Sequence, residues 1–181
     1  MDDAGWAARF PSLWGLDFQP YANADLTFRL GVPDDDLVTR PHLVAQVADG
    51  RVVVCRSEQG WRFLPGGRRE VGESLTDLAG RELREEAGCE LRGEIEVFAH
   101  QAVHSRNPSP HHPHFPHPSS AWALAAAQVE RIGPPTNPPD GERVVEVRTL
   151  PVTEAAAWLR EHEDEPADVL LLADALGLLR T

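Results

Sequence analysis

The chain has 181 residues, of which 29 are acidic and 17 are Lys or Arg, so its formal net charge is −12 and its pI is about 5.0. This length suits one domain with its own core plus a short extension, and the lack of a basic excess argues against duplex DNA or RNA as a partner. All of the Lys and Arg positions are arginine, which excludes a P-loop lysine and a Schiff-base mechanism.

Neither the cysteines nor the first residues point to secretion. Cys55 and Cys89 are too few for a disulfide framework and lack CxxC or zinc-ligand spacing. The segment MDDAGWAARF carries acids where a signal peptide needs basic residues, and no apolar run reaches the roughly 18 residues of a membrane span. We therefore expect reduced thiols in a soluble, cytoplasmic protein without a membrane partner.

The first 38 residues differ in composition from the rest of the chain. They hold six aromatic residues among Pro and Gly and run into the acidic turn PDDD at 33–36. Five of the aromatic residues lie within the first 21 positions: Trp6, Phe10, Trp14, Phe18 and Tyr21. We expect residues 1–38 to form an extension that packs on a domain spanning 39–181. The extension could also mediate pairing into a homodimer.

Strands interspersed with a few helices are expected along the domain. HLVAQVA at 42–48, the dipeptide Asp49-Gly50 and RVVVC at 51–55 predict a hairpin with a two-residue turn. Further strands are expected at 61–65, within 90–103 as one or two strands, at 119–129 and at 142–150, and helices at 75–87, 153–162 and 167–179. This order predicts an α/β protein, a mixed sandwich.

The segment 75–87 has distinct helix-start and helix-stop signals. Ser74 followed by Asp77 is a capping-box pattern, and Gly88 stands where a left-handed C-cap glycine belongs. At about 100° per residue, Glu82 and Glu86 continue the stripe that begins with Leu75, Leu78 and Ala79. The carboxylates therefore extend the face that a structural helix would bury.

Two unpaired carboxylates taken out of water would be costly or would become protonated, so a cation must compensate them. Arginine and a metal ion are the candidates. Arg81 should point to the other side of the helix from Glu86, so a divalent cation fits better. Glu82, Glu85 and Glu86 offer hard oxygen ligands, which favour Mg²⁺ or Mn²⁺ over zinc. Just upstream, the pair Gly66-Gly67 can bring a bare backbone carbonyl close to the same ion.

The spacing of these residues resembles the Nudix box. Gly67, five residues, Glu73, seven residues and then RELREEAGC at 81–89 fill every fixed position of that motif. The resemblance implies an α/β/α sandwich with a mixed sheet. It also implies Mg²⁺-dependent hydrolysis of a nucleoside diphosphate linked to another group.

The same resemblance assigns roles to the motif. Glu82 and Glu86 would be the principal metal ligands, Glu85 a further ligand or the base, and the Gly66 carbonyl another ligand. Glu73 and Arg81 would join the loop and the helix through a salt bridge. Cleaving a phosphoanhydride requires neutralised phosphate charge and a deprotonated water, and bound divalent ions supply both.

Family members often draw one more acid from a strand or loop after the box. Glu142, at the start of ERVVEVRTL, is the candidate for this catalytic acid, and Glu146 on the same strand is the alternate. An exposed charge at a strand end explains either residue equally well.

Arginines crowd the region before the helix, and the planar guanidinium suits phosphate oxygens. We expect one of Arg62, Arg68 and Arg69 to contact the substrate, although alternate strand positions would place some of them on a solvated face. Four aromatic residues could stack on a base, although aromatic residues in strands more often belong to the core: Trp61, Phe63, Phe115 and Trp122.

The segment SRNPSPHHPHFPHP at 105–118 has no periodicity and is dense in proline, which predicts a loop. Its histidines have no zinc-type spacing, and the prolines between them restrict their convergence. Three interpretations stay open: a second metal site, a substrate lid and a solvated loop.

Two functions from different classes fit these patterns. The first is a Mg²⁺-dependent pyrophosphohydrolase acting on a small nucleotide-type substrate such as ADP-ribose, another nucleotide sugar or a nucleoside triphosphate. The second is a non-catalytic module that keeps the fold and senses a nucleotide. The intact set of motif residues favours the enzyme, and the acidic composition disfavours RNA decapping.

Overall fold

The computed structural model describes residues 3–15, 18–138 and 143–180. The strands are β1 (Phe18–Gln19), β2 (Ala24–Leu30), β3 (Val38–Gln46), β4 (Val52–Ser57), β5 (Arg62–Phe63), β6 (Cys89–Leu91), β7 (Glu96–Ser105), β8 (Ser119–Arg131) and β9 (Val144–Leu150). The helices are α1 (Asp3–Arg9), α2 (Pro11–Gly15), α3 (Leu75–Ala87), α4 (Val152–Arg160) and α5 (Asp164–Ala175), with a 3-10 turn, η1 (Asp35–Leu37).

The strands form one mixed sheet. Its order is β1-β2-β7-β8-β3-β4-β5, with β6 paired to β8 and β9 paired to β4. β3 and β8 run parallel to each other, whereas β2 with β7, β7 with β8 and β4 with β9 are antiparallel. The parallel pair brings the start of β3 beside the start of β8, which is where the loop 105–118 ends.

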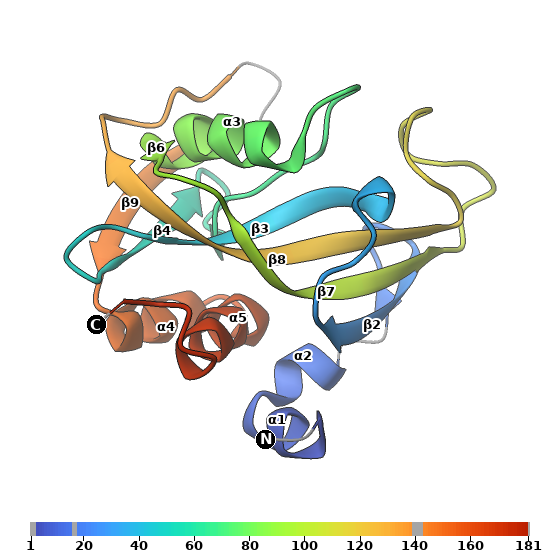
Figure 1. Cartoon of the computed structure of the whole chain (residues 1–181), viewed down its shortest axis with the longest axis horizontal. Coiled ribbons are helices and arrows are strands. Elements are labelled where there is room, and N and C mark those ends of the chain that lie inside the picture. The colour runs from blue at the N-terminus through green and yellow to red at the C-terminus, as the bar shows by residue number, and fades with distance from the viewer. Residues whose placement is uncertain (1–2, 16–17, 139–142, 181) are drawn as a thin grey trace.

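Helices cover both faces of this sheet, with α3 on one side and α4 and α5 on the other (Figure 1). Side chains alternate along the strands, so Leu43 and Val53 pack beneath α3, while Val44 and Val52 pack against the layer of α4 and α5. The predicted α/β/α sandwich with a mixed sheet is confirmed.

β3 and β4 form the predicted hairpin, but its turn is longer than expected. Val47 N–H donates to Arg51 O at 2.9 Å and Gly50 N–H donates to Val47 O at 3.0 Å. Three residues therefore separate the closing pair, and the predicted two-residue turn is wrong. Gly50 has φ +85°, a left-handed conformation that glycine adopts without strain and that a three-residue hairpin loop requires.

The N-terminal segment contributes to the core and to the sheet. Trp6, Phe10 and Leu13 are buried in the same cluster as the apolar side chains of α5. β2 pairs with β7 along its whole length, from Ala24 opposite Ser105 to Leu30 opposite Ala99. These residues pack on the remainder of the chain; the division into an extension (1–38) and a domain (39–181) stays a prediction.

Both cysteines are free thiols in the interior. Cys55 Sγ lies 3.4 Å from the backbone oxygen of Glu86, and burial, followed by the charge of Glu86, raises the pKa of this thiol well above its usual range. Cys55 is therefore a packing group beneath α3. None of the helices in the described ranges combines the length and the apolar character that crossing a bilayer requires.

Candidate active site

Helix α3 begins and ends where its capping residues predict. Ser74 Oγ accepts a hydrogen bond from Asp77 N–H at 3.1 Å, which satisfies one of the free donors of the first turn. At the other end Gly88 has φ +58°, and its N–H caps the last turn by donating to Arg84 O and Leu83 O. The helix therefore spans Leu75–Ala87, as the sequence predicted.

The acidic residues of α3 lie on its covered side. Glu82 is only 6 % exposed, between the fully buried Ala79 and Leu83, while Glu85 and Glu86 are half-buried. The expectation that the apolar stripe continues into carboxylates is confirmed for Glu82. For Glu86 it holds in part, because that side chain reaches the boundary of the buried region.

Arg81 is the cation that compensates these acids. Its Nη1 donates to Glu82 Oε1 at 2.7 Å and to Glu85 Oε2 at 3.2 Å. Its Nε and Nη2 donate to the two oxygens of Glu73 at 2.9 and 3.0 Å. The expectation that Arg81 points to the other side of the helix concerned Glu86 alone; the long Arg81 side chain bends across the helix surface to Glu82 and Glu85. The expected contact between Glu73 and Arg81 is present.

This network shifts the pKa values of its members. Burial raises the pKa of Glu82, and the charge and hydrogen bond of Arg81 offset only part of that effect. Burial would also raise the pKa of Glu73, but the hydrogen bond from Arg81 and the one from the Glu70 N–H outweigh it, so this pKa is lowered. Arg81 itself has a raised pKa because Glu73 accepts its hydrogen bonds. The guanidinium is therefore held in its charged form.

The two glycines before the helix allow it to approach β3 closely. A Cβ on Gly67 would lie 2.1 Å from Glu82 Oε1, and a Cβ on Gly66 would lie 2.1 Å from the carbonyl oxygen of Pro41. No side chain fits at either position. Gly66 N–H donates to Glu86 Oε2 at 2.9 Å. The structure thus brings Gly66 to Glu86 through its N–H; a metal-ligand role of its carbonyl stays a prediction.

The carboxylate oxygens on α3 are chemically suited to bind a divalent cation. Glu82, Glu85 and Glu86 supply hard carboxylate oxygens within two turns of one helix, and the absence of a side chain at Gly67 lets the Glu82 carboxylate lie against the loop backbone. In the described part of the chain no three acidic, His or Cys side chains lie close enough together to enclose an ion. An ion held here would use oxygens that now bond to Arg81 and to Gly66 N–H.

The residues predicted to bind substrate are separated by the sheet. Arg62 Nη1 donates to Trp158 O at 2.8 Å and pairs with Glu161 at 2.6 Å, so it belongs to the α4 side. Phe63 packs into the cluster beneath α3. Both side chains therefore have structural contacts, and a contact of either with substrate stays a prediction.

Arg69 and Arg68 lie nearer to the acidic helix. Arg69 Nε donates to Glu73 O at 2.7 Å and its Nη2 pairs with Asp35 at 2.9 Å, so it fastens the loop before α3 to η1. The side chain of Arg68 is exposed and lines a pocket, while its backbone oxygen accepts from Arg81 Nη2 at 2.9 Å. Of the three arginines, Arg68 alone lines this pocket.

The predicted additional acid cannot be placed. Glu142 lies outside the described residues. Its alternate, Glu146, pairs with Arg56 at 2.7 Å and with Arg148 at 2.6 Å, which lower its pKa in that order. Arg148 in turn lies over the ring of Trp158 in α4. Glu146 therefore faces the α4 side of the sheet, and the structure does not bring it to the acids of α3.

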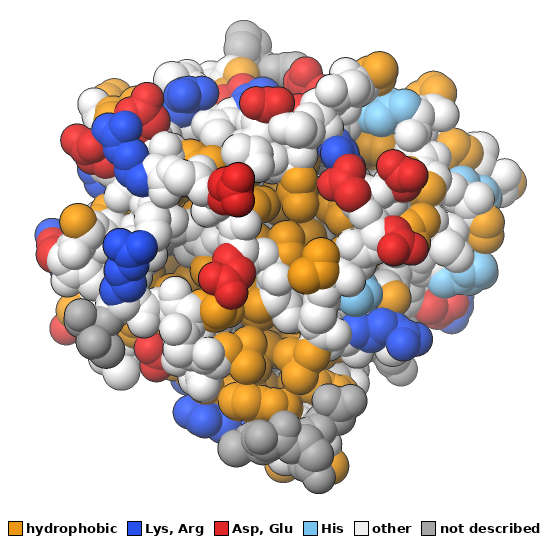
Figure 2. Space-filling view, in the orientation of Figure 1, with side chains coloured by type: hydrophobic (Ala, Val, Ile, Leu, Met, Phe, Trp, Pro, Cys, Tyr) orange, Lys and Arg blue, Asp and Glu red, His pale blue; other side chains and the backbone are white. Residues whose placement is uncertain are grey.

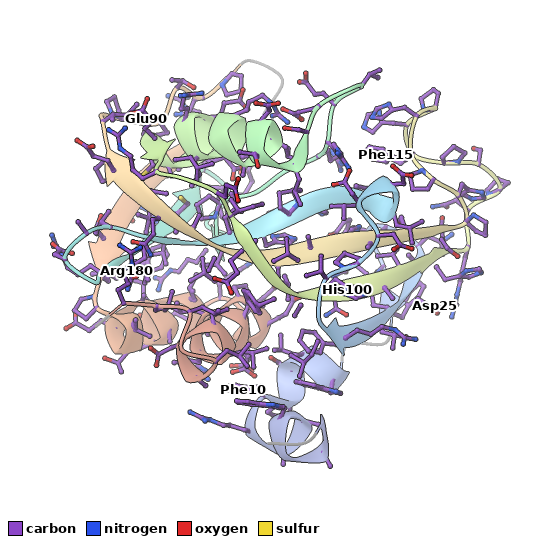
Figure 3. All side chains as sticks on the ribbon, in the orientation of Figure 1. Phe10, Asp25, Glu90, His100, Phe115 and Arg180 are labelled. Atoms are coloured by element: carbon purple, nitrogen blue, oxygen red, sulfur yellow. The ribbon has the colours of Figure 1, made fainter. Side chains whose placement is uncertain are left out.

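The loop 105–118 lies across the end of the sheet next to the acidic helix. His114 Nε2 is 2.9 Å from Arg69 O, so the loop contacts the segment that precedes α3. Figure 2 shows histidine side chains gathered on this side of the molecule, where Figure 1 draws the loop between β7 and β8. Figure 3 shows Phe115 on the side of this loop that faces α3.

Beneath this loop lies a pocket of about 150 Å³ that sequence reasoning did not foresee. Its lining joins the loop to three earlier segments of the chain, through Tyr21, Arg40 and Arg68. The aromatic character of Tyr21 was visible in the sequence, but its position beside Trp122 was not, since a hundred residues separate them.

Comparisons with known proteins agree with this architecture. The sequence model described as NUDIX domain matches residues 39–172. The Bacillus subtilis pyrophosphohydrolase BsRppH is similar at 16 % identity and TM-score 0.51, over 70 % of this chain and 72 % of that chain. A NUDIX hydrolase from Nitrosomonas europaea is similar at 17 % identity and TM-score 0.55, over 77 % and 88 %. No curated protein sequence matches the chain.

At such low identities the solved structures support the fold, whereas the domain match extends over most of the chain. It contains every residue of the motif from Gly67 to Cys89, and the structure places that motif on the loop and helix described above. The chain therefore belongs to the Nudix hydrolase family.

Proposed function

We propose that the protein is a divalent-cation-dependent pyrophosphohydrolase that cleaves a phosphoanhydride bond in a nucleoside diphosphate linked to another group. The observation that carries this proposal is the buried carboxylate of Glu82, pressed against Gly67 although burial raises its pKa. A helix with a purely structural role would place an apolar side chain there, because an incompletely compensated buried charge destabilises the fold.

The cofactor in this proposal is Mg²⁺ or Mn²⁺, with Glu82, Glu85, Glu86 and the Gly66 carbonyl as its ligands. When bound, the ion would neutralise phosphate charge and help to deprotonate the attacking water. Glu85 is the proposed further ligand or base. Its carboxylate has one bond to Arg81, at 3.2 Å, which is longer than the 2.7 Å bond of Glu82.

Other chain residues position these groups. Glu73 and Arg81 hold the loop against the helix, and Arg68 is the proposed contact to substrate phosphate. ADP-ribose, other nucleotide sugars and nucleoside triphosphates are the candidate substrates. A cytoplasmic location, pairing into a homodimer and the exclusion of nucleic acid polymers and membranes as partners stay predictions.

The test is release of phosphate or pyrophosphate from a panel of nucleotide derivatives with Mg²⁺, with Mn²⁺ and with EDTA. We expect at least one compound to be hydrolysed with a metal ion and none in EDTA. Full turnover in excess EDTA would contradict the carboxylate site. Tight nucleotide binding without turnover of any compound would favour the non-catalytic sensing module.

Glu86→Gln separates a metal-binding role from a structural one. The amide keeps an oxygen for Gly66 N–H and removes one of two like charges at i, i+4, so without metal the variant should be more stable by about 0.5 kcal/mol. Mg²⁺ should raise the melting temperature of the wild type more than that of the variant. Turnover should fall by orders of magnitude.

The matched control is Glu90→Gln, which changes a half-buried glutamate outside the motif that pairs with Arg92 at 3.0 Å. It should keep both turnover and the response to Mg²⁺. A Glu86→Gln protein that melts lower without metal and keeps near-normal turnover would show that Glu86 is structural.

A further inference from the structure

The pocket under the loop 105–118 is large enough to receive a planar group. Its volume of about 150 Å³ is roughly ten times the ~10 to 15 Å³ that a cavity needs to hold one water molecule. The shape of the walls decides which part of a substrate could enter.

One wall is a platform of three conjugated groups, in which Tyr21 and the Arg40 guanidinium both lie against the Trp122 ring. Tyr21 and Trp122 stack with ring centroids 6.0 Å apart and planes inclined by 7°. Arg40 Cζ lies 5.2 Å from the Trp122 centroid, and Arg40 Nη1 donates to Tyr21 Oη at 2.9 Å. Tyr21 is 65 % exposed, so burial in the core does not account for its place in this platform.

The loop itself provides the other wall. Phe115 packs edge-on against His112 and His114, with centroid separations of 4.9 and 4.6 Å. His114 holds the loop to Arg69 O, and His117 Nε2 lies 3.0 Å from Asn107 O. Aromatic groups from two distant segments therefore line the same pocket.

The pocket is joined to the acidic helix through Arg68. Adjacent Cα atoms are ~3.8 Å apart, and Gly67, which rests on Glu82, immediately precedes Arg68. The Arg68 side chain lines the pocket and has no hydrogen bond or ion pair to another described residue. Its guanidinium is therefore available to phosphate oxygens between the pocket and the carboxylates.

We propose that this pocket binds the nucleobase of the substrate, stacked on the platform of Tyr21, Trp122 and Arg40 with its phosphates beside Arg68. This inference rests on the proposed function. Every base has a π face that aromatic side chains and guanidinium planes can cover.

An inorganic or aliphatic diphosphate would leave these aromatic faces uncovered. The lining therefore favours nucleoside-type substrates over other diphosphates. The preference for a ligand with a base is assigned to Tyr21 and Phe115, which come from the N-terminal segment and from the loop. Neither residue belongs to the motif at 67–89.

The test measures binding without turnover. Calorimetric titration in EDTA would compare AMP, GMP, CMP and UMP with ribose 5-phosphate, which has the same sugar phosphate and no base. Wild type should bind at least one nucleotide about tenfold more tightly than ribose 5-phosphate, and Tyr21→Ala and Phe115→Ala should lose most of that preference. Trp61→Ala is the control, because Trp61 is 53 % exposed on the β4–β5 hairpin and does not line the pocket.

Equal affinity of wild type for the nucleotides and for ribose 5-phosphate would overturn the inference, as would a full base preference in both pocket variants. The outcome is independent of catalysis. Base preference lost in Tyr21→Ala supports the base site even if no compound is hydrolysed. Hydrolysis with an unchanged KM for nucleotides in both variants would overturn the base site and leave the hydrolase proposal standing.

Discussion

Arg81 joins three acidic side chains and the loop before α3 into one unit. Replacing it with alanine should lower the free energy of unfolding by about 3 kcal/mol, because Glu82 would remain buried without its cation. Urea denaturation in EDTA measures this loss. Adding Glu82→Gln to the same chain should restore at least half of it, since a buried amide costs less than a buried unpaired charge.

Arg84→Ala is the matched control for that experiment. Arg84 is on the same helix, its side chain is 54 % exposed, and its nearest acid, Glu90, is 3.9 Å away. Its removal should change stability by less than about 0.5 kcal/mol. Equal losses of unfolding free energy from Arg81→Ala and Arg84→Ala would show that the Arg81 network contributes no more to stability than an exposed arginine does.

His42 makes stability depend on pH. Burial, followed by the charge of Arg40, lowers its pKa from 6.5 to about 3. The native state therefore keeps His42 neutral, while the unfolded chain takes up a proton below pH 6.5. The stabilisation is complete above that pH and is lost as the pH falls toward 3.

His42→Gln should remove this part of the acid sensitivity. Between pH 6.5 and 5.5 the wild type should lose about 1 kcal/mol more than the variant. Urea denaturation at both pH values gives the comparison. The other titrating groups contribute equally to the pH dependence of both proteins, so their contribution cancels in the difference. Parallel losses would mean that His42 ionises as freely in the native protein as in the unfolded chain.

Single residues were predicted well where the spacing along one helix determined them. The caps Ser74 and Gly88 and the burial of Glu82 follow from spacing along α3 alone. The bonding of Arg81 did not follow, because helical spacing places the Cβ but not the end of a long side chain. The position of Tyr21 beside Trp122 depends on the pairing of β2, β7 and β8, which no local pattern encodes.

At the scale of elements, the loop 105–118 is attached to the loop before α3 by His114. Removing the contact between His114 Nε2 and Arg69 O should make the amides of 105–118 exchange with deuterium about fivefold faster, the equivalent of one hydrogen bond of ~1 kcal/mol. His114→Ala is the variant. His111→Ala serves as the control, since His111 belongs to the same loop and lacks a hydrogen bond to other described residues.

The lid interpretation adds a further expectation for that loop. If a nucleotide occupies the pocket, its binding should slow exchange in the wild type and do so less in His114→Ala. Exchange that is unaffected by nucleotide in both proteins would support the solvated-loop interpretation.

The elements that the sequence predicted are those marked by a local run or a helical period. Runs of β-forming or apolar residues identified β3, β4, β8 and β9, and helical periods identified α4 and α5, each within a few residues. β2 was not predicted, because the composition of the first 38 residues masked the short run ADLTFRL. Its strand structure comes from pairing with β7, a contact far apart in the sequence.

At the scale of the whole molecule, the N-terminal segment completes both the core and one side of the sheet. α2 contacts α5, and Leu13 is fully buried among the apolar side chains of that layer. Without β2, the long strand β7 would become an exposed edge with unpaired backbone groups. The stability of the family domain is therefore expected to depend on residues that precede it.

Leu13→Ala in the full chain should lower the free energy of unfolding by about 3 kcal/mol, because shortening a buried leucine leaves a cavity.

Removal of the N-terminal segment tests the same dependence more severely. The melting temperature should fall from the full chain to 18–181, which lacks α1 and α2, and fall again in 39–181, which also lacks β2. Circular dichroism melts and size-exclusion chromatography measure both losses. If 39–181 kept the oligomeric state of the full chain and melted at the same temperature, the first 38 residues would be an appendage, and the boundary at residue 38 would divide two independent parts of the protein.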